Sequence, residues 1–210
     1  MFRVLAVPLA VLAFHTSARP LTPVERSQIV ASGEYHQGCP VPLAGLRLLD
    51  VTYWGFDGRA HSGQLVVNAT AVGPLSTVFR RLYAMRFPIH HMSFAYIYDR
   101  HARIPADGDL TGSFECRQAV PSPCTGGKGT GHWSMHAYGE AVDINAVENP
   151  YVGCGQTRDK TAVSFMNRSR VRKGMVTPAV VAAFRSVGWG WGGSWAGSTH
   201  DYMHFSATGH

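Results

Sequence analysis

Ser134-Met135-His136-Ala137-Tyr138-Gly139-Glu140-Ala141-Val142-Asp143-Ile144-Asn145 combines an alternating apolar pattern with side chains that can bind a metal ion. If its second half is a short strand, Val142 and Ile144 point to one face and Asp143 points to the other. We therefore expect the apolar pair to face the core and Asp143 to face a cleft. Gly139 permits a tight return that would bring the imidazole of His136 to the same point as the carboxylate.

A second segment, His200-Asp201-Tyr202-Met203-His204-Phe205, repeats this pattern near the end of the sequence. As a strand, it would direct Met203 and Phe205 to the core, and Tyr202 and His204 to the cleft. Asp201 lies an odd number of residues before His204, so in a regular strand the two would face opposite sides. We therefore expect Asp201 on a turn or bulge just before the strand.

The two segments together predict a metal site. Two histidines and one carboxylate, His136, His204 and Asp143, form a three-ligand zinc set whose fourth position is left for water. Zinc lowers the pKa of that water towards ~7, which makes hydroxide available at neutral pH. A base must take the proton, and Asp201 is the first candidate. Glu140 competes, although strand alternation would point it away from Asp143.

These residues also have purely structural interpretations. The sequence contains 11 histidines, and a lone histidine is usually an ordinary polar residue of the surface or the core. Asp143 could cap a turn. The pattern HxxxxxxD with a distant DxxH is also less self-sufficient than HExxH. Spacing alone therefore leaves both interpretations open.

The motifs themselves resemble a known family. Ser134-x-His136-x-x-Gly139-x-Ala141-x-Asp143, followed by Asp201-x-x-His204, is similar to the zinc D-alanyl-D-alanine carboxypeptidases and L-alanyl-D-glutamate endopeptidases. This family includes the vancomycin-resistance carboxypeptidases and shares a core with the Hedgehog signalling domain. The resemblance spans about residues 38–206 and points to an actinobacterial-type branch, through the following further segments: Tyr53–Gly58, Leu65–Asn68, Arg86–Ile89, Asn149–Tyr151 and Gly188–Gly193.

The resemblance implies a role for each matching position. His136, Asp143 and His204 would bind Zn²⁺, and Asp201 would be the general base and later protonate the leaving amine. Arg117 would lie near the reacting carbonyl, where a guanidinium can bind a carboxylate or stabilise the oxyanion.

Other interpretations remain beside these roles. Arg117 alone could be a surface salt bridge. Ser134 and Tyr202 are weaker candidates for substrate contact, and either could equally be structural.

The sequence also departs from the family before this arginine. Members of the branch commonly carry Asn-Thr-Ser-x-Phe-Asn-Cys-Arg, whereas this chain has Leu110-Thr111-Gly112-Ser113-Phe114-Glu115-Cys116-Arg117. Leu110 and Glu115 stand where the family has asparagine. The metal ligands are unaffected, but the choice of substrate could differ.

Four cysteines, Cys39, Cys116, Cys124 and Cys154, predict two disulfides in an exported protein. They form no CxxC pair, which argues against a four-cysteine zinc site. Four cysteines allow three pairings, and spacing does not choose among them. The family resemblance favours Cys39–Cys116 with Cys124–Cys154. The alternative joins Cys116 to Cys124.

The N-terminus resembles an export signal. Met1-Phe2-Arg3 supplies a positive charge, Val4 to Phe14 is apolar, and Thr16-Ser17-Ala18 resembles a cleavage site. We expect residues 1–18 to be a cleaved signal, 19–45 a lead-in and 46–210 the zinc peptidase domain. A buried N-terminal helix or a retained anchor is the alternative. After cleavage we expect no membrane insertion.

The net charge of the chain indicates which kinds of partner it could bind. The net charge of +6 favours anionic polymers such as a bacterial wall. Because the basic residues are scattered and export separates the protein from most nucleic acid, we do not expect nucleic-acid binding. We expect a monomer.

The local patterns predict a single α+β domain around an antiparallel sheet, with flanking helices. One helix carries the apolar face Leu75, Val78, Phe79 and Leu82, and a second starts at Thr177-Pro178 and stops at Gly188. Ile104 to Gly131 should be irregular. The following segments should be strands: Leu46–Phe56, Gln64–Val67, Met92–Tyr98, Glu140–Asn145 and Tyr202–Ser206.

These features predict a secreted zinc peptidase of peptidoglycan stem peptides, acting as a D-alanyl-D-alanine carboxypeptidase. An endopeptidase of the same family is one alternative. Another is an inactive wall-binding module that keeps zinc as a structural ion, although Asp201 argues against it, because structural zinc needs no adjacent base. Trp189, Trp191 and Trp195 could form a stacking platform beside the site, but we favour packing in the core.

Overall fold

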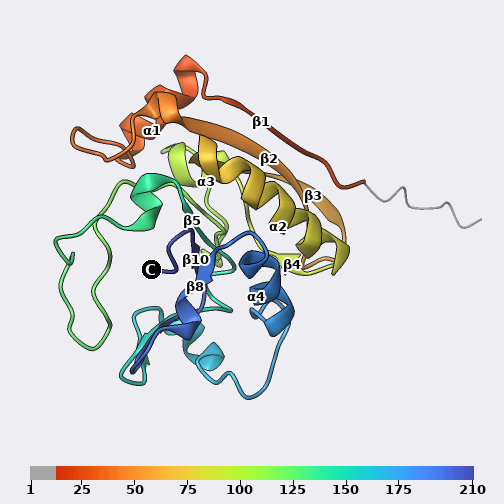
Figure 1. Cartoon of the computed structure of the whole chain (residues 1–210), viewed down its shortest axis with the longest axis vertical. Helices are drawn as coiled ribbons and strands as arrows, with labels where there is room; N and C mark the ends of the chain where they lie inside the picture. Colours follow the sequence, from red (N-terminus) through yellow and green to blue (C-terminus); the bar gives the residue numbers. More distant parts are fainter. Residues whose placement is uncertain (1–12) are drawn as a thin grey trace, which may run out of the picture.

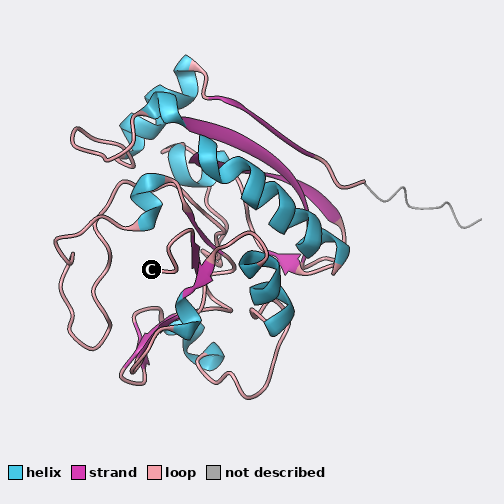
Figure 2. Ribbon diagram, in the orientation of Figure 1, coloured by secondary structure: helices cyan, strands magenta, loops and turns pink. Residues whose placement is uncertain are grey.

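The computed structural model describes residues 13–210 and has the α+β architecture predicted from the sequence (Figures 1 and 2). Its strands form three small sheets, in which all pairs but one are antiparallel. The expected single sheet is therefore divided, and the candidate site lies where the second and third sheets meet.

The first sheet contains β1 (Thr16–Pro20), β2 (Leu46–Gly55) and β3 (Ala60–Asn68), and short β4 (Pro88–Ile89) adds to β2 in parallel. β2 and β3 form the predicted hairpin. Both faces of the sheet are covered. Leu49 and Val51 pack towards α2 (Val72–Ala84), whereas Leu46 and Leu48 pack towards α1 (Pro23–Ser32) and α3 (Phe94–Tyr98). Figure 1 shows α2 lying along the sheet.

Helix α2 confirms the predicted apolar face, since Leu75, Val78, Phe79 and Leu82 are all buried. Helix α4 (Pro178–Arg185) begins at the expected Thr177-Pro178 and packs beside α2. Its Phe184 ring stacks on Phe205 at 3.7 Å between centroids. This stack joins α4 to the strand that carries His204.

The second sheet has the order β5 (Ala141–Asp143), β10 (His204–Ser206) and β8 (Gly190–Trp191). The third has the order β7 (Gln156–Thr157), β6 (Tyr151–Gly153) and β9 (Thr199–Asp201). Five 3-10 helices complete the described elements: η1 (Leu43–Gly45), η2 (Ala69–Ala71), η3 (Met135–Tyr138), η4 (Lys160–Phe165) and η5 (Gly192–Ser194).

The predicted strand at Met92–Tyr98 is wrong, because residues Phe94–Tyr98 form helix α3. Phe94 and Tyr98 are spaced by one helical turn, so a helix buries both rings on one face. The Tyr98 hydroxyl donates to Phe114 O at 2.6 Å. Aromatic residues favour strands on average, but here the burial of two rings on the same side decides the conformation.

The lead-in contains a helix that the sequence patterns did not predict, α1 (Pro23–Ser32). Thr22 and Glu25 form a capping box at its start, and Pro23 occupies its first turn. Ile29 is its one fully buried side chain. Because the apolar face of this helix is so narrow, the spacing of its apolar residues did not indicate a helix.

Most of the predicted export signal, residues 1–12, lies outside the described residues. Thr16, Ser17 and Ala18 belong to β1 and pair with β2. Phe14 packs against the core, and its ring lies 5.6 Å from that of Tyr83. Among the described residues, no helix has the length and hydrophobicity that a membrane span requires.

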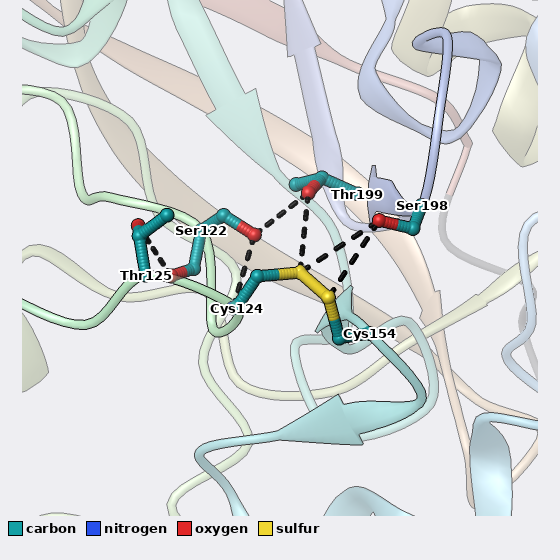
Figure 3. Close-up of a disulfide and its surroundings, with 6 residues drawn as sticks. All are labelled: Ser122, Cys124, Thr125, Cys154, Ser198 and Thr199. Atoms are coloured by element: carbon teal, nitrogen blue, oxygen red, sulfur yellow. Dashed lines mark hydrogen bonds between the residues drawn. A yellow bond between two sulfur atoms is a disulfide. The ribbon is translucent and has the colours of Figure 1, made fainter.

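The two disulfides are those favoured by the family resemblance, Cys39–Cys116 and Cys124–Cys154. The first links the lead-in to the residue before Arg117. The second links the irregular segment 104–131 to the residue after β6. Figure 3 shows it beside Ser122, whose Oγ lies 2.7 Å from Thr199 Oγ1 at the start of β9. The second disulfide thus braces the strand that ends at Asp201.

Candidate metal centre and active site

Strands β5 and β10 place two of the predicted ligands side by side. Their antiparallel register sets Asp143 directly opposite His204. Val142, Ile144 and Phe205 on the other face are fully buried in the core, which holds both strands in place. The alternation of apolar and ligand residues thus fixes which face of the sheet carries the site.

His136 reaches the same point from η3. The Ser134 hydroxyl caps this short helix by accepting from His136 N at 3.3 Å. Gly139 ends it with a φ of 66°, a conformation that favours glycine. A Cβ at Gly139 would also lie 2.6 Å from Asn68 N. The chain can therefore turn against β3 and return into β5 only with glycine here.

The three side chains converge on one point. His136 Nε2 lies 3.1 Å from His204 Nδ1, and each of these nitrogens lies 3.2 Å from Asp143 Oδ1. Tetrahedral zinc with bonds of about 2.0–2.2 Å sets its ligand atoms about 3.3–3.6 Å apart. The triangle formed by the three atoms is therefore close to the size that zinc requires.

The tautomers of both histidines support a cation between them. His136 Nδ1 lies 2.5 Å from Ser113 O, and His204 Nε2 lies 3.4 Å from His210 O. A carbonyl accepts only, so each of these nitrogens donates and the other nitrogen of each ring presents a lone pair. Two lone pairs and a carboxylate oxygen then face one another. Such a set of acceptors is stable only around a positive charge.

The proton affinities of the ligands agree with this view. Burial raises the pKa of Asp143, but the neighbouring His136 and His204 outweigh burial and hold the pKa well below its usual range. Burial lowers the pKa of His136, and the Asp143 carboxylate outweighs it, so the pKa is raised overall. Asp143 is therefore ionised and ready to bind a cation.

Asp201 lies in the same cavity but belongs to the third sheet. It ends β9, and only Tyr202 and Met203 separate it from β10. Because the strand is interrupted here, Asp201 and His204 face the same cavity, although residues three positions apart in a regular strand would face opposite sides. Burial, and then the nearby Asp143 carboxylate, raise the pKa of Asp201 to about 7. Its Oδ1 is buried and has no hydrogen-bond partner among residues 13–210.

Glu140 does not line this cavity. Its Oε1 accepts from Thr70 Oγ1 at 2.6 Å, which holds the side chain against η2. Of the two carboxylates considered as base, the structure brings Asp201 alone into the cavity.

Arg117 lines the cavity together with the three ligands and Asp201. Its Nε forms an ion pair with Glu115 Oε2 at 2.6 Å, and its Nη1 donates to Gln118 O at 3.3 Å. Burial lowers the pKa of Arg117, but Glu115, Asp143 and Asp201 outweigh this and raise it, so the guanidinium remains charged. Nη2 has no hydrogen-bond acceptor within the described part of the chain. That nitrogen is available to a ligand in the cavity.

The cavity has a volume of about 400 Å³ and an aromatic wall. Ser134 lies at its edge, whereas Tyr202 does not line it, because the Tyr202 ring packs under the Arg168 guanidinium and beside His200. The expectation that Met203 faces the core is wrong, since Met203 lines the cavity instead. The strand is interrupted after Asp201, and the side chains of Tyr202 and Met203 therefore point in the opposite directions from those expected in a continuous strand.

Two aromatic residues of the wall, Tyr151 and Trp195, were not predicted as site residues from their sequence context. Trp195 lies beside His204, with 6.0 Å between ring centroids. Trp189 is buried and Trp191 packs against the core. The preference for core packing thus holds for Trp189 and Trp191, and Trp195 is the exception.

A second cavity, of about 390 Å³, adjoins the candidate metal centre. It shares His136, Asp143 and Met203 with the first. Its remaining wall includes Glu34 and both residues that depart from the family pattern, Leu110 and Glu115. Burial, followed by the nearby Glu115 carboxylate, raises the pKa of Glu34 to about 7. The metal centre therefore adjoins two hollows of similar size.

Residues 128–207 match the model of a family described as D-alanyl-D-alanine carboxypeptidase. This segment belongs to that zinc peptidase family. The match contains the three ligand candidates and Asp201, whereas Arg117 lies before it. It confirms the family resemblance of the sequence, but the actinobacterial-type branch stays a prediction. No curated protein and no solved structure matches the chain.

Proposed function

We propose that this protein is a secreted zinc peptidase that hydrolyses peptidoglycan stem peptides in the bacterial cell wall, as a D-alanyl-D-alanine carboxypeptidase. The observation that carries the proposal is the convergence of His136, Asp143 and His204 in a cavity that also contains the Asp201 carboxyl, whose Oδ1 has no hydrogen-bond partner among residues 13–210. A structural metal site would have no need of that carboxyl. The family match, the export-like N-terminus and the two disulfides support the substrate and the location.

Each group of the cavity has a part in the proposed reaction. Zinc, when bound by the three ligands, polarises the scissile carbonyl and lowers the pKa of water. Asp201 accepts the proton of the attacking water and delivers it to the leaving amine. A carboxyl whose pKa is about 7 can do both at neutral pH. Its Oδ1 is buried and has no hydrogen-bond partner in the part of the chain that the structure describes, so it is left for the water or the amine.

Arg117 would hold the substrate during this exchange. Glu115 fixes the Nε edge of the guanidinium, and Nη2 is left to bind a carboxylate or the oxyanion of the tetrahedral intermediate. Tyr151 and Trp195 offer apolar surface to the peptide on the same side.

The test is hydrolysis of a stem pentapeptide ending in D-Ala-D-Ala, followed by mass spectrometry, with zinc-loaded wild type beside Asp201→Asn. We expect the wild type to release the terminal D-Ala. Asp201→Asn should lose about 10²- to 10⁴-fold in kcat while still binding zinc. Glu140→Gln is the matched control, because it also removes one carboxylate charge near the ligands but lies outside the cavity. Its kcat should stay within about twofold of wild type.

The second cavity favours one alternative, an endopeptidase. A substrate that fills both hollows would extend past the metal centre. A cut at an internal bond in the same assay would establish this activity and reject the carboxypeptidase. If zinc-loaded wild type cleaved no stem peptide, both proposals would fail, and a wall-binding module would be the better description.

A further inference from the structure

A second group of side chains that could bind a metal ion lies beside the turn that follows β5, outside the cavity that holds Asp201. His90 follows β4, Asp109 lies in the irregular segment, and Glu148 lies in the turn between β5 and β6. His90 Nε2 lies 3.3 Å from Asp109 Oδ2 and 3.4 Å from Glu148 Oε1. These separations match those expected between ligands of one tetrahedral ion, about 3.3–3.6 Å apart.

The burial of the two carboxylates is the second observation. Asp109 is 1% exposed and Glu148 is 6% exposed. Asp109 Oδ2 and Glu148 Oε2 are both buried and lack hydrogen-bond partners among residues 13–210. No lysine or arginine of the described chain forms an ion pair with either side chain, and His90 is the one residue of residues 13–210 that forms an ion pair with both. One imidazole can neutralise only one of the two carboxylates, so the other must carry a proton or face a bound cation.

His90 is oriented as a metal ligand would be. The Asp107 carboxylate lies 3.9 Å from His90 Nδ1, on the opposite edge of the ring from the two buried carboxylates. Nε2 faces the two buried carboxylates, so it is the ring nitrogen that would bind an ion held between them. The ring stacks on Phe56 at 3.6 Å between centroids, which limits its rotation.

His90 brings this group close to the surface. It lines a surface cavity of about 480 Å³ together with Phe56, Asp57, His61 and His91, whereas Asp109 and Glu148 do not line that cavity.

We propose that His90, Asp109 and Glu148 bind a second divalent transition-metal ion, of the zinc or manganese class. One imidazole and two carboxylates suit such ions. The role is structural: Asp109 Oδ1 accepts from Val147 N at 3.1 Å, and His90 N donates to Asn145 Oδ1 at 2.9 Å. The ion would therefore tie the turn after β5 to the segment after β4.

Metal content per chain tests this inference without any activity assay. The full-length protein is loaded with Zn²⁺ or, separately, Mn²⁺, desalted, and measured by native mass spectrometry. Wild type should bind about two ions of the favoured metal. The isosteric double variant D109N/E148Q should bind about one and retain a native circular dichroism spectrum. The matched control Asp57→Asn, an exposed carboxylate beside the same surface cavity, should still bind about two.

A reciprocal variant guards against misfolding of D109N/E148Q. His136→Ala removes a ligand of the first centre and leaves the second untouched, so it should still bind about one ion. Only one ion on wild type, two on the double variant, or none on His136→Ala would overturn the inference. Because the readout is stoichiometry, two ions on a protein that cleaves no stem peptide would refute the proposed function alone.

Discussion

At the residue scale, the proposed role of Arg117 in substrate binding can be tested independently of metal binding, because Arg117 is not a metal ligand. Arg117→Lys keeps the positive charge but loses the planar fork that contacts Glu115 and leaves a nitrogen for the substrate. We expect kcat/KM for the stem peptide to fall about 10- to 100-fold, since removal of one oxyanion or carboxylate donor has an effect of at least this size. Zinc affinity should not change.

The control for this prediction is Arg59→Lys, a conservative change on the β2–β3 turn, outside both cavities of the metal centre. Steady-state kinetics and a zinc titration on the same preparations decide the matter. Equal kcat/KM for Arg117→Lys and wild type would remove Arg117 from the proposed mechanism.

The residues that sequence could and could not identify differ in a physical way. His136 and Asp143 are close in sequence, and strand alternation with one glycine is enough to suggest that they meet. His90, Asp109 and Glu148 come from three separate segments and share no motif, so nothing local indicates that they converge. Glu34 and Glu115 are also far apart in the sequence. The Cys39–Cys116 disulfide and the folded backbone bring them together.

At the scale of elements, the turn from η3 into β5 has the strictest requirement. Gly139→Ala would combine a positive φ with a Cβ 2.6 Å from Asn68 N, so η3 must shift and carry His136 with it. We expect a loss of about 2–4 kcal/mol in the free energy of unfolding and weaker zinc binding.

Gly188→Ala is the control that separates the effect of backbone strain at a positive φ from the effect of a steric clash that displaces η3. Gly188 has a φ of +84°, yet a Cβ there meets nothing within 4 Å. Its cost should be about 1 kcal/mol, with zinc affinity unchanged. Denaturation curves and zinc titrations of the two variants test the pair. If Gly139→Ala bound zinc as tightly as Gly188→Ala, the turn would not be what positions His136.

Elements that bury many apolar residues were predicted from sequence, and those with few or mixed apolar residues were not. Strands β2 and β3 and helices α2 and α4 each bury a clear set of apolar residues. Helix α1 buries only Ile29, and α3 is a single turn of aromatic residues that favour strands elsewhere. The predicted last strand is divided into β9 and β10, which pair in two different sheets. The alternation of apolar and polar residues does not indicate with which sheet each part pairs.

At the scale of the whole molecule, Glu34 links stability to pH. Its pKa is about 7 in the folded chain, against 4.5 for an ordinary glutamate. The folded state therefore holds this proton more tightly, and the associated stability is complete below about pH 4.5 and lost as the pH rises through about 7. Because Glu34 is partly exposed, solvent screening reduces the loss to about 1 kcal/mol.

Glu34→Gln should consequently raise the free energy of unfolding by about 1 kcal/mol at pH 8 and leave it unchanged at pH 4. Glu25→Gln should have the opposite sign at pH 8. Arg19 lowers the pKa of Glu25 to about 2, so its stabilising effect is present above about pH 4.5 and lost at lower pH. Urea denaturation at both pH values checks this. Destabilisation by Glu34→Gln at pH 8 would contradict the assignment.

The two-residue link between β9 and β10 also has a consequence for how such proteins can diverge. The ligands stand on one sheet and η3, whereas Asp201 stands on another sheet, where it pairs with Tyr151. A shortened or shifted β6 would withdraw the carboxyl while every ligand stayed in place. A hydrolase of this design is therefore a few backbone changes from a metal-binding recognition domain, with the rest of the molecule intact.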